Sequence, residues 1–273
     1  MDEIDRFLNE DVGKNGDITS DALFTDEKAS AVITAKDDCI IAGLSEAQTV
    51  FQKTGATAEL LFKEGDKVKK GQPVVTIEGP ARSILKAERL ALNFIGRMSG
   101  IATETYYLVE RCRKINPRVT IAATRKTTPG FRLYEKKAII IGGGEPHRYG
   151  LYDVVMIKDN HLKLIGSVEE AIRRAQQNTR KKIIEIEVEN EPDALTAARM
   201  SVDVIMLDNF DAKTAARIAQ KIRAINPHVL IEVSGGITRD NIEQYAAFAD
   251  RISLGYLTHS VKSKDFSLEI FKN

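Results

Sequence analysis

The chain has 273 residues, enough for one large α/β domain or for two domains that share an interface. Its 40 basic and 39 acidic residues leave a net charge of +1, which excludes a general attraction to nucleic acid or acidic membranes. No apolar run approaches the ~20 residues that span a bilayer, and the two cysteines, Cys39 and Cys112, lie far apart in apolar contexts. We therefore expect buried free thiols in a soluble cytoplasmic protein, without nucleic-acid or membrane partners.

The first third of the chain predicts a small α/β sandwich. Short apolar runs indicate strands at residues 31–35, 39–43, 58–63 and 73–78. Helices are expected at 5–11, 44–51, 81–99 and 103–115, the last ending before Asn116-Pro117.

A turn at residues 64–72, EGDKVKKGQ, resembles the turn of biotinyl and lipoyl carrier domains. This raises the hypothesis of a carrier or ligand-binding module. Carrier domains display their lysine at a hairpin tip, and no such hairpin is evident in this sequence. A glycine-punctuated turn with solvated charges is the favoured interpretation.

From Val119 onward the pattern becomes a regular alternation of strands and helices. Apolar runs predict strands at 119–123, 153–157, 183–188, 203–207, 229–233 and 251–254. Repeated βα units indicate a parallel sheet wrapped by helices. Six or seven units fit a partial or closed barrel better than a Rossmann sheet, because no GxGxxG follows the first strand.

Residues 124–161 contain seven arginines and lysines, a concentration of positive charge that suits anion binding. For Arg132, Lys136 and Lys137 we expect a solvated helix face. Arg125, Lys126 and Lys158 instead directly follow apolar strands, where the active site of a barrel is built.

Polar residues follow every later strand as well. The full set of strand-end residues is Arg125, Lys126, Lys158, Asp159, Glu189, Asp208, Ser234, Gly235, Gly236 and Gly255. The early cations suit carboxylates or phosphates, and Glu189 and Asp208 suit Mg²⁺ or ribose hydroxyls. The late glycine turns suit a phosphate. Together they imply a sugar phosphate, a diphosphate with Mg²⁺ and a second anionic substrate.

Longer motifs carry a resemblance to the quinolinate phosphoribosyltransferases. They are AERLALN (87–93), SGIAT (99–103), TRKTTPGFR (124–132), GGG (142–144) with His147-Arg148, IKDNH (157–161), EVE (187–189), LDNF (207–210), SGGI (234–237) and the turn at 255–259. The resemblance implies a reaction of quinolinate with phosphoribosyl pyrophosphate. The products would be nicotinate mononucleotide, pyrophosphate and carbon dioxide, in de novo NAD biosynthesis.

The resemblance also implies the domain arrangement. Residues 1–105 would form an N-terminal α/β sandwich, residues 106–259 an incomplete (β/α) barrel of six or seven parallel strands, and residues 260–273 a tail that returns to the first domain. The family forms a homodimer, or a higher oligomer of dimers, in which the sandwich of one subunit covers the barrel mouth of the other. Arg89 would then reach into the partner's site.

Site roles follow from the same resemblance. Arg125, His147 and Arg148, with Arg89 of the neighbour, would bind the quinolinate carboxylates. Lys126 and Lys158 would face the pyrophosphate, while Glu189 and Asp208 would serve the ribose hydroxyls and Mg²⁺, directly or indirectly. The 5′-phosphate would lie against Ser234, Gly235, Gly236, Gly255 and His259. His161 completes a motif and suits a hydrogen-bonding role.

Two other enzyme classes remain as alternatives. One is a paralogue associated with molybdate transport that acts on another anionic substrate, although the basic residues of the substrate pocket are all present here. The other is a sugar-phosphate isomerase or aldolase built on a barrel.

Overall fold

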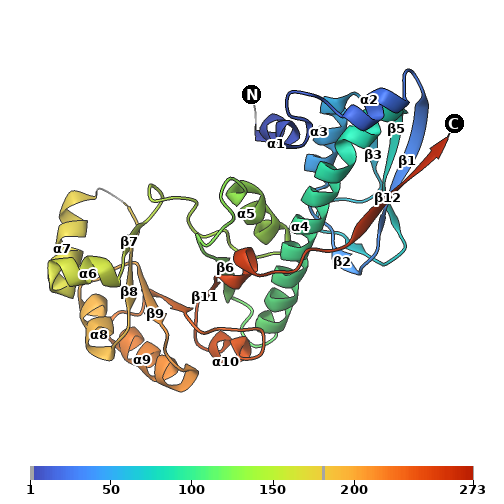
Figure 1. Ribbon diagram of the computed structural model, residues 1–273. Helices are drawn as coiled ribbons and strands as arrows, with labels where there is room; N and C mark the ends of the chain where they lie inside the picture. Colours follow the sequence, from blue (N-terminus) through green and yellow to red (C-terminus); the bar gives the residue numbers. More distant parts are fainter. Residues whose placement is uncertain (1–2, 180–181, 273) are drawn as a thin grey trace. The chain divides into compact units, whose positions relative to one another are not determined.

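The computed structural model describes residues 3–179 and 182–272. Its chain divides into two units, which are described separately below. The first comprises Met1–Glu104, Ile140–Gly142 and Ser260–Asn273, and the second Thr105–Ile139 and Gly143–His259. Figure 1 shows both units along the chain.

The first unit is built on a four-stranded antiparallel sheet with the order β12-β1-β5-β3. Its strands are β1 (Lys28–Ala35), β3 (Thr57–Leu60), β5 (Pro73–Pro80) and β12 (Phe266–Lys272). Alternate residues of β1 are buried, as expected for a sheet with one face on the core. The last strand of the chain thus pairs with the first, and the predicted sandwich is confirmed.

Helices and a small second sheet complete this unit. They are α1 (Glu3–Val12), α2 (Ile18–Leu23), α3 (Leu44–Thr54), β2 (Cys39–Ile40) and β4 (Lys67–Val68). The carrier-like turn at residues 64–72 makes hydrogen bonds and an ion pair with other segments of this unit. Glu64 accepts hydrogen bonds from the N–H groups of Gly43 and Ser45 at 2.9 and 3.1 Å, at the start of α3. Lys69 pairs with Asp38 at 2.8 Å.

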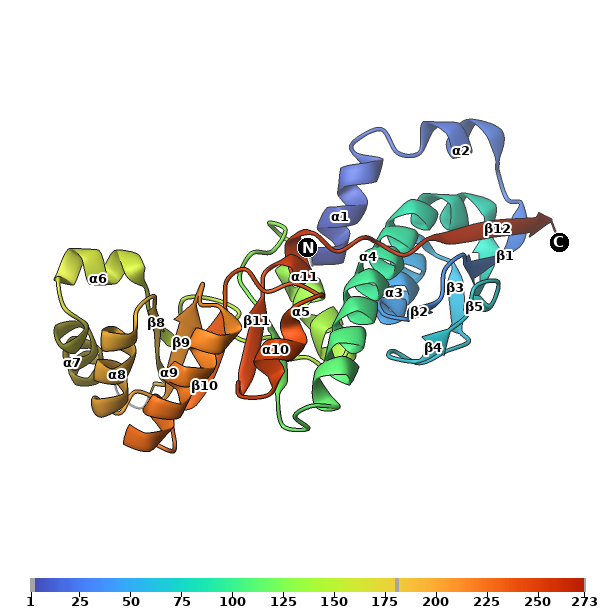
Figure 2. The same ribbon diagram turned by 90° about the horizontal axis from the view of Figure 1, so that it is seen from below.

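One long helix, α4 (Ala81–Arg113), replaces the two helices predicted at 81–99 and 103–115. The expected break was wrong because Gly100 serves close packing rather than a turn. A Cβ there would lie 2.4 Å from the carbonyl oxygen of Lys262, and one at Gly96 would lie 2.8 Å from that of Lys264. The two glycines let the C-terminal segment run along α4 (Figure 2), where the Lys264 N–H donates to the Gly96 carbonyl at 3.0 Å.

The second unit contains a parallel six-stranded sheet with the order β6-β11-β10-β9-β8-β7. Its strands are β6 (Thr120–Ala123), β7 (Val155–Ile157), β8 (Ile184–Val188), β9 (Val204–Asp208), β10 (Leu230–Ser234) and β11 (Arg251–Leu254). The six predicted strands are therefore confirmed, with ends shifted by a residue or two. They are rich in buried apolar residues, as strands covered on both faces must be.

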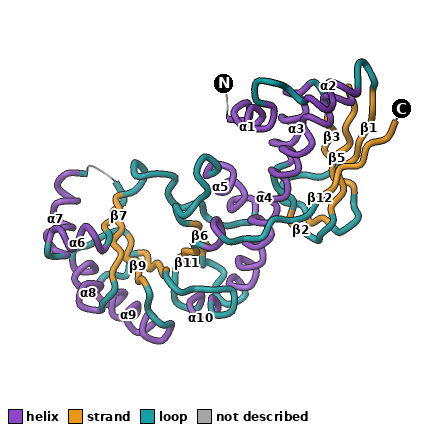
Figure 3. The backbone as a smooth tube through the Cα atoms, in the orientation of Figure 1, coloured by secondary structure: helices purple, strands orange, loops and turns teal. Residues whose placement is uncertain are grey.

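The helices of this part of the chain are α5 (Arg132–Ile141), α6 (Asp159–Ile165), α7 (Val168–Asn178), α8 (Glu191–Arg199), α9 (Ala212–Ile225), α10 (Ile242–Ala246) and α11 (Tyr256–His259). Of these, α7, α8 and α9 lie on the outer side of the sheet (Figure 3). Helix α9 shows why they pack. Its buried residues, Ala215, Ile218, Ala219 and Ile222, recur at the spacing of one helical face.

The barrel is incomplete, because no pairing joins β6 to β7 within residues 3–179 and 182–272. A one-residue bridge instead adds Glu145 beside Ala122 of β6. The Glu145 N–H donates to the Ile121 carbonyl at 2.8 Å, and the Ala123 N–H donates to the Glu145 carbonyl at 3.0 Å. This bridge anchors the loop that follows Glu145 at the open edge of the barrel.

Both cysteines are buried free thiols, as predicted. Burial raises the pKa of the Cys39 thiol and of the Cys112 thiol to about 11, so neither is reactive at neutral pH. Among the helices in the described part of the chain, none is long and apolar enough to cross a membrane.

Candidate active site

A pocket of about 430 Å³ opens at the carboxyl ends of the barrel strands, a size suited to a small organic ligand. It is lined by Ala123, Thr124, Arg125, Lys126, His147, Arg148, Met156, Lys158, Glu187, Met206, Asp208, Glu232, Ser234 and Ser253. The structure therefore brings together six of the predicted site residues that carry charge: Arg125, Lys126, His147, Arg148, Lys158 and Asp208.

A second hollow of about 320 Å³ adjoins this pocket and shares Lys126, Asp208 and Ser234 with it. Its lining includes four of the residues predicted to bind the 5′-phosphate, namely Gly235, Gly236, Gly255 and His259. Gly235 has a φ of +80°, and a Cβ there would lie 2.2 Å from Oδ1 of Asn209. Only glycine fits this turn, which leaves backbone groups free to approach a ligand closely.

Lys126 lies where the two hollows meet. Its carbonyl accepts a hydrogen bond from Oγ1 of Thr258 at 2.7 Å, and its N–H donates to Oγ1 of Thr124 at 3.1 Å. A Cβ at Gly255 would lie 3.0 Å from Cδ of Lys126. The backbone of Lys126 is thus held from both sides, while its side chain crosses the glycine turn.

The mouth of the pocket carries a cluster of charges that we call the mouth cluster: Lys126, Lys158, Glu187 and Asp208. Lys158 hydrogen-bonds Glu187, and the Lys158 side chain remains 39% exposed. Burial and then the charge of Glu187 raise the pKa of Asp208, despite the opposing effects of Lys158 and Lys126. Two carboxylates and two ammonium groups therefore share one small space.

Glu189 lies outside the pocket lining, although its charge is among those that raise the pKa of Asp208. It lies one residue beyond β8, its side chain is exposed, and it does not line the pocket. Glu187, two residues earlier, lines the pocket instead. Successive side chains of a strand point to opposite faces of the sheet. A polar residue within the strand can therefore face the barrel interior, just as a residue at the end of the strand can. The alternation in Ile184-Glu185-Ile186-Glu187-Val188 was the signal that could have identified Glu187.

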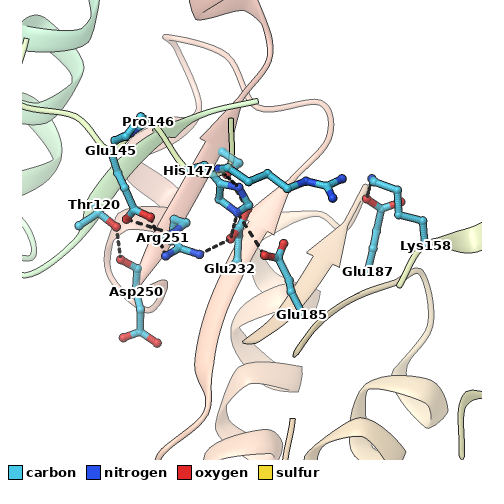
Figure 4. Close-up of polar contacts among 12 residues, drawn as sticks. Thr120, Glu145, Pro146, His147, Lys158, Glu185, Glu187, Glu232, Asp250 and Arg251 are labelled. Carbon is cyan, nitrogen blue, oxygen red and sulfur yellow. Dashed lines mark hydrogen bonds and ion pairs between the residues drawn. The ribbon is translucent and has the colours of Figure 1, made fainter. Parts of the chain in front are cut away.

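A second, buried cluster, which we call the floor cluster, comprises His147, Glu185, Glu232 and Arg251 (Figure 4). Nε2 of His147 lies 3.1 Å from Glu185 and 3.5 Å from Glu232. Nη1 of Arg251 donates to Glu232 at 3.0 Å, and Oγ of Ser253 donates to the other oxygen of the same carboxylate at 2.5 Å. Sequence reasoning missed both glutamates because each lies inside an apolar strand.

The floor cluster sets the charge of His147. Burial alone lowers the pKa of its imidazole, but contacts with Glu185 and Glu232 outweigh burial and raise that pKa to about 9. Burial raises the pKa of Glu185, whereas His147, Arg251 and Ser253 outweigh burial at Glu232 and lower its pKa. The neutral ring also accepts the Arg148 N–H at Nδ1, 2.8 Å away, a contact that a second ring proton would break. The charge of His147 is therefore coupled to the backbone of Arg148.

His147, Glu185 and Glu232 also offer one nitrogen and two carboxylates within 4.8 Å of one another, as a metal site would. Glu232 is not a free ligand, however, because Arg251 and Ser253 already donate to both of its oxygens. A guanidinium at 3.0 Å from one ligand atom would also repel a cation. The cluster is better described as a buried ion-pair network.

Two arginines form the most cationic wall of the pocket. Arg148 is only 7% exposed, and Nε of Arg125 is buried with no hydrogen-bond partner among the residues described. Burial, followed by the charge of Arg125, lowers the pKa of Arg148. Buried guanidinium groups that repel each other and keep unsatisfied donors are suited to a carboxylate ligand.

His161 and Arg89 have simpler surroundings. Nδ1 of His161 accepts the N–H of Lys158 at 2.9 Å, at the start of α6, so His161 helps to orient the catalytic lysine candidate. Arg89 belongs to the first unit, on α4, and its side chain is 68% exposed. It does not line the pocket of the second unit.

Helix α5 corrects one expectation. Arg132, Lys136 and Lys137 were predicted to form a solvated face, but Lys136 is completely buried and Arg132 and Lys137 are partly buried. The count of charges along a helix does not reveal that loops from other elements cover it. Burial lowers the pKa of Lys136 to about 8.

The fold and the pocket together define a barrel enzyme that binds anionic substrates at the carboxyl ends of its strands. Comparison with known families agrees in detail. The model of the quinolinate phosphoribosyl transferase C-terminal domain matches residues 101–269, and that of the N-terminal domain matches residues 17–99. The chain belongs to the quinolinate phosphoribosyltransferase family.

Relatives and solved structures support the same assignment. A protein of Archaeoglobus fulgidus named "Probable nicotinate-nucleotide pyrophosphorylase (carboxylating)" is 42% identical, with 94% of this chain and 99% of that protein covered. The human nicotinate-nucleotide pyrophosphorylase (carboxylating) is 38% identical, with 89% and 82% covered. The crystal structure of NadC from Streptococcus pyogenes has a TM-score of 0.92 at 38% identity, with 99% and 95% covered.

Proposed function

We propose that this enzyme transfers the phosphoribosyl group of phosphoribosyl pyrophosphate to quinolinate. The reaction releases pyrophosphate and carbon dioxide and gives nicotinate mononucleotide, in de novo NAD biosynthesis. The observation that carries the proposal is the lining of the barrel pocket, where five basic residues and the mouth carboxylates surround one cavity beside a glycine turn. The family relationship supports the same reaction, and the molybdate-associated alternative is not favoured.

Quinolinate carries two carboxylates on adjacent ring carbons, and the cationic wall matches them. Arg125 and Arg148 offer planar guanidinium donors, and His147 adds positive charge below pH 9. Held by these groups, the ring nitrogen would face the anomeric carbon of the ribose. Such positioning lowers the entropic part of the barrier.

The mouth cluster suits the displacement step. As the bond from the anomeric carbon to the diphosphate breaks, Lys126 and Lys158 would stabilise charge on the leaving group. The carboxylates of Glu187 and Asp208 would stabilise positive charge on the ribose. The positive nitrogen of the new pyridinium then stabilises the carbanion left at the adjacent ring carbon when carbon dioxide departs, and that carbon takes up a proton in place of the lost carboxylate. The 5′-phosphate would occupy the adjoining hollow at Ser234, Gly235 and Gly236.

The mouth carboxylates also fit the predicted Mg²⁺. Asp208, with Glu187 or the predicted Glu189, supplies the oxygen ligands that this cation prefers. Burial, followed by the charge of Glu187, raises the pKa of Asp208, and a bound cation would favour its ionised form. When bound, Mg²⁺ would neutralise charge on the diphosphate. Loss of turnover in excess EDTA, restored by added Mg²⁺, tests this requirement, and full activity in EDTA would refute it.

The first experiment is to incubate the purified protein with quinolinate, phosphoribosyl pyrophosphate and Mg²⁺, and to measure carbon dioxide and nicotinate mononucleotide. Nicotinate is the matched control, because it lacks one carboxylate. Equal amounts of both products from quinolinate, with none from nicotinate, are expected. No product from quinolinate would refute the proposed function.

We further propose a cytoplasmic homodimer with shared sites, in which Arg89 of one subunit serves the pocket of the other. The exposed position of Arg89 supports a role outside its own unit, and the buried free thiols suit a reducing compartment. Mixing Arg89→Ala with Lys126→Ala subunits should restore part of the activity, since one site in each heterodimer keeps both residues. Verified heterodimers without activity would contradict shared sites.

A further inference from the structure

Helix α5 connects the two loops that carry the cationic wall. One loop, residues 124–131, follows β6 and contains Arg125 and Lys126. The other, residues 145–149, contains His147 and Arg148. Three side chains of α5 contact these loops: Arg132, Glu135 and Lys136.

The first loop is held by Glu135 and Arg132. Glu135 is completely buried and accepts both the N–H and the Oγ1 hydroxyl of Thr128, each at 3.0 Å. Nε of Arg132 donates to Oγ1 of Thr127 at 2.9 Å. These bonds fix the chain directly after Arg125 and Lys126.

The second loop is held on either side of its two ligand-binding residues. Lys136 donates to the carbonyl of Pro146, immediately before His147. Nη1 of Arg132 donates to the carbonyl of Tyr149 at 2.8 Å, immediately after Arg148. His147 has a φ of +54°, a conformation that a histidine adopts only when its surroundings hold it there.

Lys136 is an unusual choice for a residue that only fills space. It is completely buried, and within the described ranges it forms no ion pair with a carboxylate. The charges that act on it most are Arg132 on its own helix, Arg148 in the second loop and Arg125 after β6, all of which lower its pKa, and Asp153, which raises it. Its Nζ also lies 6.0 Å from the ring centre of Tyr149. A buried ammonium without a counter-charge is costly, so methionine or leucine would pack there more favourably.

We propose that Lys136 is a positioning residue for pyridine-dicarboxylate binding. It holds the carbonyl of Pro146 so that His147 and Arg148 face the ligand, and the anionic ligand adds to the weak balance that Asp153 gives its charge. This inference rests on the proposed function, because the ligand is the quinolinate dianion.

A second consequence is proton uptake. In the free enzyme the pKa of Lys136 lies near 8, lowered by burial and by the three arginines. A dianion beside those arginines cancels part of their repulsion and favours the charged lysine. At about pH 8, quinolinate binding should therefore be accompanied by proton uptake.

Titration calorimetry of quinolinate near pH 8, in two buffers of different ionisation enthalpy, measures affinity and proton uptake together. The variants are Lys136→Met, Lys136→Arg and, as a matched control on the same helix, Lys137→Met. We expect Lys136→Met to bind about tenfold more weakly or worse, the effect of losing one hydrogen bond from a charged donor, and to keep only the small uptake that His147, with a pKa of about 9, contributes. Lys136→Arg should keep most of the affinity with the same small uptake, and Lys137→Met should match the wild type.

Steady-state kinetics separates positioning from general damage. Loss of positioning should raise the KM for quinolinate and leave the KM for phosphoribosyl pyrophosphate unchanged. Wild-type affinity and proton uptake in Lys136→Met, or equal rises in both KM values, would overturn the inference. If the wild type itself does not bind quinolinate, the proposed function fails first and the inference fails with it.

Discussion

Two charged clusters share the strands of the barrel, one at the mouth of the pocket and one at its floor. At the mouth, Lys158 is 39% exposed and Glu187 12% exposed. At the floor, Glu185 is 1% exposed and Glu232 is fully buried. Similar residue types therefore stand in very different dielectric surroundings, only a few residues apart on the same strands.

The difference in exposure indicates that the mouth cluster binds ligand and the floor cluster stabilises the fold. Exposed charges keep their water and can exchange it for a ligand at little cost, so the mouth cluster is available for chemistry. Buried charges must be paired, and removing one partner leaves another uncompensated. The side chains of the floor cluster are committed to one another, although His147 and Glu232 also line the pocket. Mutations should therefore affect activity at the mouth and stability at the floor.

The largest expected effect is on stability at the floor. Glu232→Ala removes a fully buried carboxylate from Arg251, His147 and Ser253 at once, although Arg251 keeps its pair with Glu145, and we expect a loss of ~3–5 kcal/mol in the free energy of unfolding. Urea denaturation measures it. The control is Glu191→Ala, which removes the surface pairs to Arg217 and Lys221 and should cost ~0–1 kcal/mol. Equal losses in the two variants would show that the floor contributes no special stability.

At the mouth, the expected loss is catalytic. Lys126→Ala or Asp208→Ala should lower kcat by ~10²–10³, because each removes a charge that faces the developing transition state. The thermal unfolding midpoint should stay at the wild-type value, since both groups are partly exposed. Carbon dioxide release gives the rate. Wild-type turnover in either variant would remove that residue from the mechanism.

A smaller effect on kcat/KM should distinguish Glu187, which lies within β8, from Glu189, which lies just after it. Glu187→Gln should lower kcat/KM about tenfold, because the amide no longer balances Lys158 inside the pocket. Glu189→Gln should change little, since its side chain is exposed and outside the lining. Kinetics of both variants under the same conditions decides the point. A larger effect at Glu189 would restore the role predicted for it.

The smallest effect is on pH dependence. Because the pKa of His147 is raised to about 9 from 6.5, the ring is cationic below that value and neutral above it. Affinity for quinolinate should therefore fall as pH rises through about 9. Glu185→Gln removes one cause and should move the fall to lower pH by about one pH unit. Both measurements are made in the Lys136→Arg background, because Lys136 also titrates in this pH range. If Glu185→Gln does not move the pH dependence of affinity, His147 is not its source.

Sequence patterns predicted the barrel well because its strands are buried on both faces and end in polar residues. The alternation of apolar runs with helices located all six strands, and the residues after them located Lys126, Lys158 and Asp208. These are local signals. Parallel strands place their carboxyl ends on one edge, so local signals were enough to predict a common site.

The predictions that were wrong or incomplete share a physical cause, which is burial of the residue by segments distant in the sequence. Lys136 resembled a solvated lysine because the loop that covers it comes ten residues later, at Pro146. Glu185 and Glu232 resembled ordinary strand residues because their partners are brought together only by the curvature of the sheet. The break predicted between residues 99 and 103 is absent, and Gly100 instead accommodates a segment at Lys262 that is distant in the sequence.

The pairing of β12 with β1 bears on how the protein is made. Residues 266–272 are synthesised after all the other strands of the described chain, yet they complete the sheet that begins at Lys28. The barrel, in contrast, uses only segments that are already synthesised by residue 259. During synthesis the first sheet must wait with an unpaired edge along β1, a template for pairing with other chains. Timely arrival of the C-terminal strand is therefore also a protection against aggregation.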